Sequence, residues 1–510
     1  SSAQMSQVKI LFTVALLHIC LLAWANDGEN AASKVSCTAE EIVDQDEDEV
    51  DDVVNLLQGK LVENQNIISE PHDAVSFHPE PGENVRMSWM LFGAVVFPLA
   101  ILYAINWPDE DIRRFSYETI GTAINTFMGV MIFSSANSLV EFYADEMHYS
   151  QGAKLNLKAV HMYVWLALVQ IVLYVFSHAT ASGKAEKSQP AEALHDEQTP
   201  HFKFYDEQTL DFKCGAGLTT HIAAFATTDY FLALQNYPLF SRSPLRAFAL
   251  APLASLSTWV IFRILYAVRD RVVHHEGPVT HGDELWMEET QESENDVFCV
   301  STSFVLINAL QFGLQGELPH HEDLMVLRAS KEDDLKDFLT LLAVMLILDS
   351  AVVIAVYLIG GLRDMNVRLV VIVLELLSMC SGWVTLAAAK VGQVYLDPDI
   401  DEEAITTKTQ LALALSVFAF LYALVLDKIG DKMIRGGKFH QALTKVMLSQ
   451  GLMVGFSWEQ CFFPAEENIT RGPVSAMGCS LLLCVIVLPA YRWFVLPKIL
   501  HAQHEAQGQL

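Results

Sequence analysis

The sequence contains none of the short motifs that mark common catalytic sites. It has no Walker A loop, no G-x-G-x-x-G after a strand, no G-x-S-x-G and no H-E-x-x-H. Its eight cysteines include no C-x-x-C pair, so neither a zinc site nor a disulfide framework is indicated. We therefore predict that the chain is not an enzyme, that it uses no cofactor or metal, and that it does not hydrolyse ATP.

Charged residues are also scarce, and basic residues are the scarcer kind. Charged residues make up 18% of the chain and hydrophobic residues 52%. The mean hydropathy of +0.29 is typical of membrane proteins rather than of soluble enzymes. The net charge of -29 argues against nucleic acid as a partner, since nucleic-acid binding depends on neutralising phosphates with basic residues.

The start of the chain has the pattern of a secretory signal. Lys9 precedes an apolar run that ends in an A-x-A pattern at Ala25. Residues 1–25 are predicted to be a signal peptide or an uncleaved signal anchor, and both place the next segment on the extracytoplasmic side. Residues 26–87 are acidic and polar, so we expect a disordered extracytoplasmic tail there.

Eleven apolar runs follow, each near the length that a helix needs to cross about 30 Å of hydrocarbon. We predict an all-α fold, a polytopic integral membrane helical bundle over residues 88–496 with a short cytosolic tail at 497–510. The expected partner of this surface is the lipid bilayer. The runs are 88–106, 118–142, 157–178, 217–236, 247–268, 296–314, 338–360, 368–390, 409–427, 445–463 and 474–496.

Three signals predict one orientation in the membrane. The signal segment places the first loop outside, and Lys and Arg are then modestly enriched in the predicted cytosolic segments. The sequon at Asn468 falls in a predicted outer loop, which makes Asn468 a candidate glycosylation site. We expect a multi-pass protein of the secretory pathway or plasma membrane, with an extracytoplasmic N-terminus and a cytosolic C-terminus.

Two acids lie well inside neighbouring apolar runs, Asp349 in 338–360 and Glu375 in 368–390. An ionised carboxylate in lipid is costly, so such a residue usually faces a partner or a water-filled cavity. Counting at 1.5 Å per residue, their depths differ by roughly 6 Å, so they could share a cavity. Two like charges so close could not both ionise easily, which suits proton coupling. The alternative is that each acid is a protonated or hydrogen-bonded packing residue.

The run 217–236 adds His221 and Asp229, about 80° apart around the helix. Asp229 is a third acid at membrane depth, whereas His221 is either a proton relay or an interfacial residue. Arg263, in the next run, is a candidate counter-ion for Glu375 or Asp229. Its alternative is an arginine that extends to the inner headgroups.

Polar residues in two further runs are candidates for the lining of a path. Asn125 belongs to a polar stripe in 118–142, and Asn308 accompanies hydroxyl residues in 296–314. Such residues either line a solute path or hold helices together by hydrogen bonds.

The sequence thus predicts a membrane transporter or channel-like protein that moves an ion or small solute, with proton coupling through the intramembrane carboxylates. The alternative is a membrane receptor or structural subunit that transports nothing, whose buried polar residues only fix helix packing. No residue pattern identifies the solute or the oligomeric state.

Overall fold

The computed structural model consists of helices throughout the part of the chain that it describes, with no strand there. The predictions for residues 1–25, for 26–80 and for most of the tail after 497 lie outside the described residues. The described residues are 81–187, 207–275, 279–316, 318, 334–359, 367–397, 400–401, 404–432, 437–470 and 472–501.

Each of the eleven apolar runs lies in a separate α-helix, which confirms the predicted all-α bundle. Most helices extend well beyond the apolar run from which they were predicted. The helices are α3 (Pro81–Ile105), α4 (Glu110–Glu146), α5 (Gln151–Lys187), α6 (Glu207–Gln235), α7 (Pro244–His275), α8 (His281–Gln315), α9 (Asp334–Ile359), α10 (Val367–Leu396), α11 (Ile405–Lys432), α12 (Gly437–Ile469) and α13 (Pro473–Ala490), which continues into the π-helix η1 (Tyr491–Val495).

Eight of the described helices are long and apolar enough to cross a membrane: α4, α5, α7, α8, α9, α10, α11 and α13 with its continuation. Two others, α6 and α12, are more polar, and both lie within the bundle. Helix α12 packs against α4, α9, α10 and α11, and α6 packs against α4, α5 and α8. Because these two helices are surrounded by protein, their hydroxyl, amide and charged side chains can find partners that lipid would not provide.

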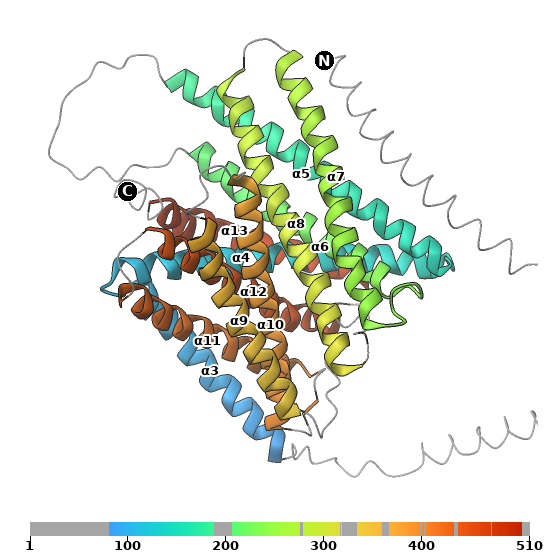
Figure 1. Ribbon diagram of the computed structural model, residues 1–510, viewed down its shortest axis with the longest axis vertical. Helices are drawn as coiled ribbons and strands as arrows, with labels where there is room; N and C mark the ends of the chain where they lie inside the picture. Colours follow the sequence, from blue (N-terminus) through green and yellow to red (C-terminus); the bar gives the residue numbers. More distant parts are fainter. Residues whose placement is uncertain are drawn as a thin grey trace, which may run out of the picture.

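The bundle consists of two groups of helices (Figure 1). The first group is α5, α6, α7 and α8, which pack on one another. The second group is α3, α4 and α9 to α13, built around the contacts of α12 with α4, α10 and α11. The two groups meet where α4 packs against α6 and α8 packs against α10. Residues that face this junction therefore lie at the centre of the molecule.

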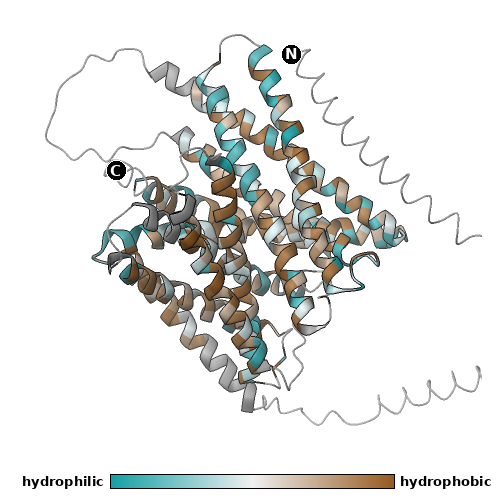
Figure 2. Ribbon diagram, viewed as in Figure 1, coloured by the Kyte–Doolittle hydropathy of each residue, from teal (hydrophilic) through white to brown (hydrophobic). Residues whose placement is uncertain are grey.

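The outer surface of the bundle is apolar. Val95 of α3, Ile347 of α9 and Val485 of α13 are 63%, 65% and 67% exposed. Hydrophobic residues likewise dominate most of the helices in Figure 2. A surface of this kind would be unfavourable in water but suits contact with lipid tails. Composition, helix length and surface together fit a membrane protein.

Glycines allow α12 to approach its neighbours closely. A Cβ atom at Gly451 would lie 2.8 Å from the carbonyl oxygen of Thr119 in α4. A Cβ atom at Gly455 would overlap the carbonyl oxygen of Ala123, one turn further along α4. These two positions form a G-x-x-x-G spacing, which brings helix backbones together in membranes.

Candidate functional site

A cavity of about 160 Å³ lies at the junction of the two helix groups. Helices α4, α6, α8, α10 and α12 each contribute to its wall. A water molecule occupies about 30 Å³ of liquid, so this volume has room for several waters or a small solute. The polar residues of the wall are Thr122, Thr220, His221, Glu292, Asp296, Glu375, Ser378, Lys445 and Ser449.

An ion pair spans the cavity wall between α10 and α12. The Lys445 Nζ atom lies 2.5 Å from the Glu375 Oε1 atom. The Glu375 side chain is 11% exposed and that of Lys445 is 32% exposed. The other carboxylate oxygen of Glu375, Oε2, is buried and has no hydrogen-bond partner among the described residues. Glu375 therefore has an acceptor left over beside the cavity.

Asp296 of α8 lines the same cavity and is not engaged in the same way. Its carboxylate forms no hydrogen bond or ion pair with any described residue. It lies close enough to interact electrostatically with both Glu375 and Lys445. Glu292, one turn earlier on α8, is exposed and also lines the cavity. We call Asp296 and Glu375 the cavity acids.

His221 forms part of the α6 wall, close to α4. Its Nδ1 atom lies 2.8 Å from the Gly217 carbonyl oxygen, one turn earlier. A carbonyl can only accept, so Nδ1 carries the proton and Nε2 is the acceptor of the neutral ring. A Cβ atom at Gly129 of α4 would lie 2.6 Å from the His221 Cβ atom, so glycine is what lets the two helices meet here.

Four aromatic rings pack together about one helical turn beyond the cavity wall. Phe225, Phe304, Trp383 and Phe456 come from α6, α8, α10 and α12, and all four are almost fully buried. The Trp383 ring centroid lies 4.7 Å from that of Phe304 and 5.3 Å from that of Phe456, which stacks on Phe225 at 5.6 Å. Trp383 Nε1 donates a hydrogen bond of 3.0 Å to Ser303 Oγ, which fixes its ring. We call these four rings the aromatic plug.

The plug follows directly from the helical repeat. Each of its rings lies four residues, or about one turn, after a residue of the cavity wall on the same helix. The plug is thus the next layer of side chains beyond the cavity, toward the C-terminal ends of these helices. The four wall residues are His221, Val300, Met379 and Leu452.

Asp229, predicted as a membrane acid, is held by an ion pair instead of lining the cavity. Lys158 Nζ of α5 lies 3.0 and 3.1 Å from the two Asp229 oxygens and 2.5 Å from Glu141 Oε1 of α4. The side chains of Lys158 and Asp229 are each 10% exposed. This cluster ties together three helices, so its geometry accounts for the buried acid.

Asp349 is likewise occupied by its neighbours. Its carboxylate accepts hydrogen bonds from Ser381 Oγ of α10, at 2.6 Å, and from the Tyr422 hydroxyl of α11. It is absent from the wall that contains Glu375, which corrects the expectation of a shared cavity. Asp349 lies level with its partner Ser381, which is roughly 9 Å further along α10 than Glu375. The expected difference in depth was roughly 6 Å, so depth is not what separates the two acids. The sequence does not determine the rotation of α9 about its axis. In the structure this rotation directs the Asp349 side chain toward α10 and α11.

Arg263 does not act as the counter-ion of either predicted acid, which corrects that interpretation. Its side chain is exposed on α7 and lies over the rings of Trp259 and Tyr266, with centroid distances of 6.0 and 5.7 Å. Helix α7 packs on α8 at the outside of the first group, away from the cavity wall. The cations that pair with Glu375 and Asp229 are Lys445 and Lys158.

The two predicted asparagines connect helices. Asn125 Nδ2 donates to the Tyr491 hydroxyl at 2.8 Å, which joins α4 to η1. Asn308 Nδ2 donates to Gln235 Oε1 at 2.8 Å, which joins α8 to α6. Neither residue lines the cavity. Asn468 is exposed in the last turn of α12 rather than in a loop, and its glycosylation stays a prediction.

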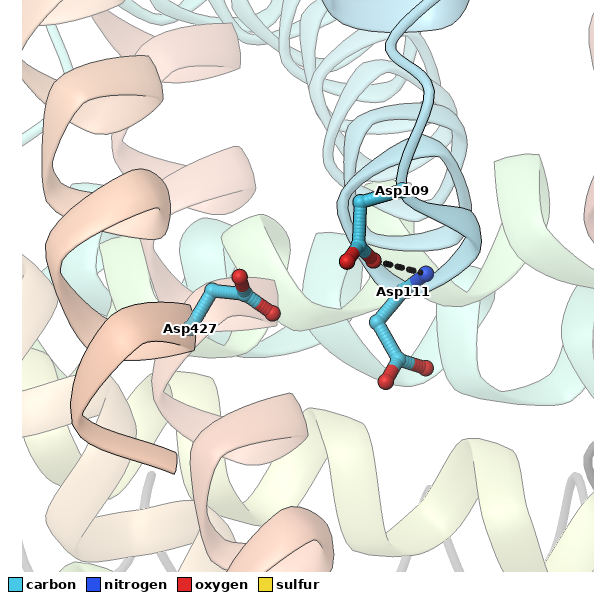
Figure 3. A group of neighbouring side chains, drawn as sticks. All are labelled: Asp109, Asp111 and Asp427. Carbon is cyan, nitrogen blue, oxygen red and sulfur yellow. Dashed lines mark hydrogen bonds between the residues drawn. The ribbon is translucent and has the colours of Figure 1, made fainter. Parts of the chain in front are cut away.

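A separate group of three carboxylates lies at the start of α4 (Figure 3). Asp109, Asp111 and Asp427 have oxygens within 4.8 Å of one another. Asp109 caps α4, since its side chain accepts from the backbone N–H of Asp111, and Asp111 lies 3.4 Å from Arg114. Helix capping and ion pairing account for the first two acids, so we assign no metal to this group.

The most informative residues of the cavity were missed by the sequence reasoning. Asp296 and Lys445 are the first residues of the apolar runs 296–314 and 445–463, so neither stands out in the sequence as a charge well inside a run. In the structure α8 begins about four turns before Asp296, and α12 begins about two turns before Lys445. Both charges therefore lie inside helices and inside the bundle.

Comparison with protein families, with curated proteins and with solved structures finds no match to this chain.

Proposed function

We propose that this chain is a multi-pass membrane transporter or channel-like protein that moves an ion or small solute through the central cavity. The observation that carries the proposal is a cavity with three acids and one lysine in its wall, between two groups of helices. Charged groups at such a place are costly for a protein that only needs to pack its helices.

The surroundings of the cavity support a solute path. In this proposal the four buried rings of the aromatic plug would close one end of the path, as hydrophobic constrictions do in gated pores. The exposed side chain of Glu292 gives the wall a polar edge. Rocking of one helix group against the other would change which end is closed, as in transporters with alternating access.

Proton coupling is part of the proposal. Asp296 and Glu375 compete for one lysine, so protonation of either acid would relieve repulsion between them. The other titratable groups that line the cavity are Glu292 on α8 and His221 on α6, while α4 contributes only Thr122. Solute movement would then depend on which of these groups carries a proton.

We also propose the predicted topology, with an extracytoplasmic N-terminus, a cytosolic C-terminus and a glycan on Asn468. Its support is the apolar surface of the bundle together with the exposure of Asn468 at the end of α12. A glycosidase-sensitive mass shift that Asn468→Gln removes would support it, and protection of both chain ends on one side would contradict it.

Transport is tested by flux across reconstituted vesicles. The purified chain would be placed in vesicles with an internal pH dye and an imposed cation gradient. Glu375→Gln is expected to lower the flux at least about tenfold, because it removes a charge from the cavity. The matched control is Asp349→Asn, a buried acid outside the cavity, which should keep most of the flux. Equal flux in both variants would remove Glu375 from the path.

One observation favours the second candidate function, a receptor or structural subunit. Asp229 and Asp349 are both satisfied by neighbouring side chains and join helices to one another. We therefore propose a packing role for these two acids within a transporter. If no ion or solute crosses vesicles that contain the folded chain, the packing function would extend to the cavity as well.

A further inference from the structure

We infer that the central cavity binds a small monovalent cation, with Asp296 as its main ligand and Lys445 as a tethered competitor. This inference names the solute class of the proposed function and rests on it.

The charge balance of the cavity favours one positive charge. The charges of Glu375 and Lys445 cancel as an ion pair, with 2.5 Å between Nζ and Oε1. An ionised Asp296 adds one net negative charge to the cavity wall, and the exposed Glu292 adds another. An anion would meet repulsion there, and one monovalent cation would neutralise the charge of Asp296.

The available ligand atoms are oxygens, which hard cations prefer. The Asp296 carboxylate and the Glu375 Oε2 atom have no hydrogen-bond partner among the described residues. The hydroxyls of Ser378 and Ser449 donate to carbonyls of their own helices, at 2.7 Å each, so their lone pairs remain free. Na⁺, K⁺ and a primary ammonium all fit this set of acceptors.

Lys445 is itself a primary ammonium held in this wall. Its contact with Glu375 shows that a cation of this size and charge is accommodated there. The volume of about 160 Å³ lets an incoming ion keep several waters, which compensates for the small number of protein ligands. A divalent ion such as Ca²⁺ needs six to eight oxygens and would be bound poorly by this set.

The test is cation-dependent stabilisation of the purified full chain in detergent. A ligand that binds only the folded state raises the unfolding temperature as its concentration rises. NaCl, KCl and methylammonium chloride would be titrated at constant ionic strength, with N-methyl-D-glucamine chloride as the replacement salt. We expect saturable stabilisation by at least one of the three cations and none by CaCl₂ at matched ionic strength.

Charge variants separate a specific site from general salt effects. Asp296→Asn should weaken the apparent affinity at least about tenfold, because it removes the main charged ligand. Lys445→Gln should strengthen it, since the competitor is gone. In the double variant Glu375→Gln with Lys445→Gln the competitor is removed as well, so its apparent affinity should exceed that of Glu375→Gln alone. Asp349→Asn, outside the cavity, should respond like the wild type.

The inference is overturned if Asp296→Asn keeps the wild-type response, or if none of the three cations stabilises the folded chain. The double variant covers the case in which Lys445→Gln alone does not fold, because it does not leave a Glu375 carboxylate without its lysine. Binding without flux would support the cation site and contradict transport. Flux of protons without cation binding would support transport and contradict the cation site.

Discussion

Glu375 and Asp349 lie on neighbouring helices, and each is an acid within an apolar stretch of sequence, yet their surroundings differ. Asp349 accepts hydrogen bonds from Ser381 and Tyr422, and Asp229 is held in the same manner by Lys158. The cavity acids instead retain unused oxygens beside open space. Burial is common to both kinds of acid, so we expect a functional acid in this bundle to be distinguished by the hydrogen bonds that it leaves unmade beside a cavity.

The largest effect should come from breaking the Asp229 cluster. Lys158→Met removes one cation from two carboxylates, Asp229 and Glu141, and leaves a buried charge unpaired. We expect the free energy of unfolding to fall by about 3–5 kcal/mol. Unfolding in detergent would measure the loss, and adding Asp229→Asn to the same chain should recover part of it. Full stability of Lys158→Met would contradict the structural role of this cluster.

A second large effect is expected at the plug. Phe456→Ala would remove a fully buried ring that touches Phe225, Trp383 and Phe304, at a cost of about 3–5 kcal/mol. If the plug closes the path, this change should also raise the passive cation leak through vesicles. Phe462→Ala, on the same helix but 41% exposed, is the control. A plug variant that folds and remains tight would show that the rings are only core.

Removing the charge of Asp349 should be milder. Asp349→Asn keeps the shape of the side chain and part of its bonding to Ser381 and Tyr422, so we expect a loss of about 1–3 kcal/mol in unfolding free energy. Its flux, corrected for the amount of folded protein, should remain near the wild-type value. A larger loss of flux than of stability would move Asp349 into the solute path.

The smallest effect is expected from a single hydrogen bond in the plug. Trp383→Phe removes the bond from Trp383 Nε1 to Ser303 Oγ but keeps an aromatic ring, at a cost of about 0.5–1.5 kcal/mol. Thermal unfolding and the leak assay together would show whether the plug needs this bond. Unchanged stability with unchanged leak would mean that ring packing alone closes the cavity.

The fold was predictable because membrane-length apolar runs follow from local composition. Each run in the sequence became one helix, and no partner residues were needed to predict it. The helix ends were less predictable, since α8 and α12 begin in polar sequence well before their apolar runs. For this reason the positions of Asp296 and Lys445 inside the bundle were not predicted.

The candidate site was predictable only in part. Glu375 and His221 were found because a polar residue within an apolar run is visible in one segment. The pairing of Glu375 with Lys445 joins residues 70 positions apart, and the plug needs one ring from each of four helices. Such contacts depend on the rotation of each helix, which apolar periodicity does not determine when the surface faces lipid.

The most direct measurement is uptake of ²²Na⁺ or ⁸⁶Rb⁺ into vesicles that contain Asp296→Asn or Asp349→Asn, compared with wild type at equal amounts of folded protein. If the cavity acids carry the solute, Asp296→Asn should lose uptake at least about tenfold while Asp349→Asn retains it. The opposite ranking, or an equal loss in the two variants, would contradict the distinction between the cavity acids and the acids that only pack helices.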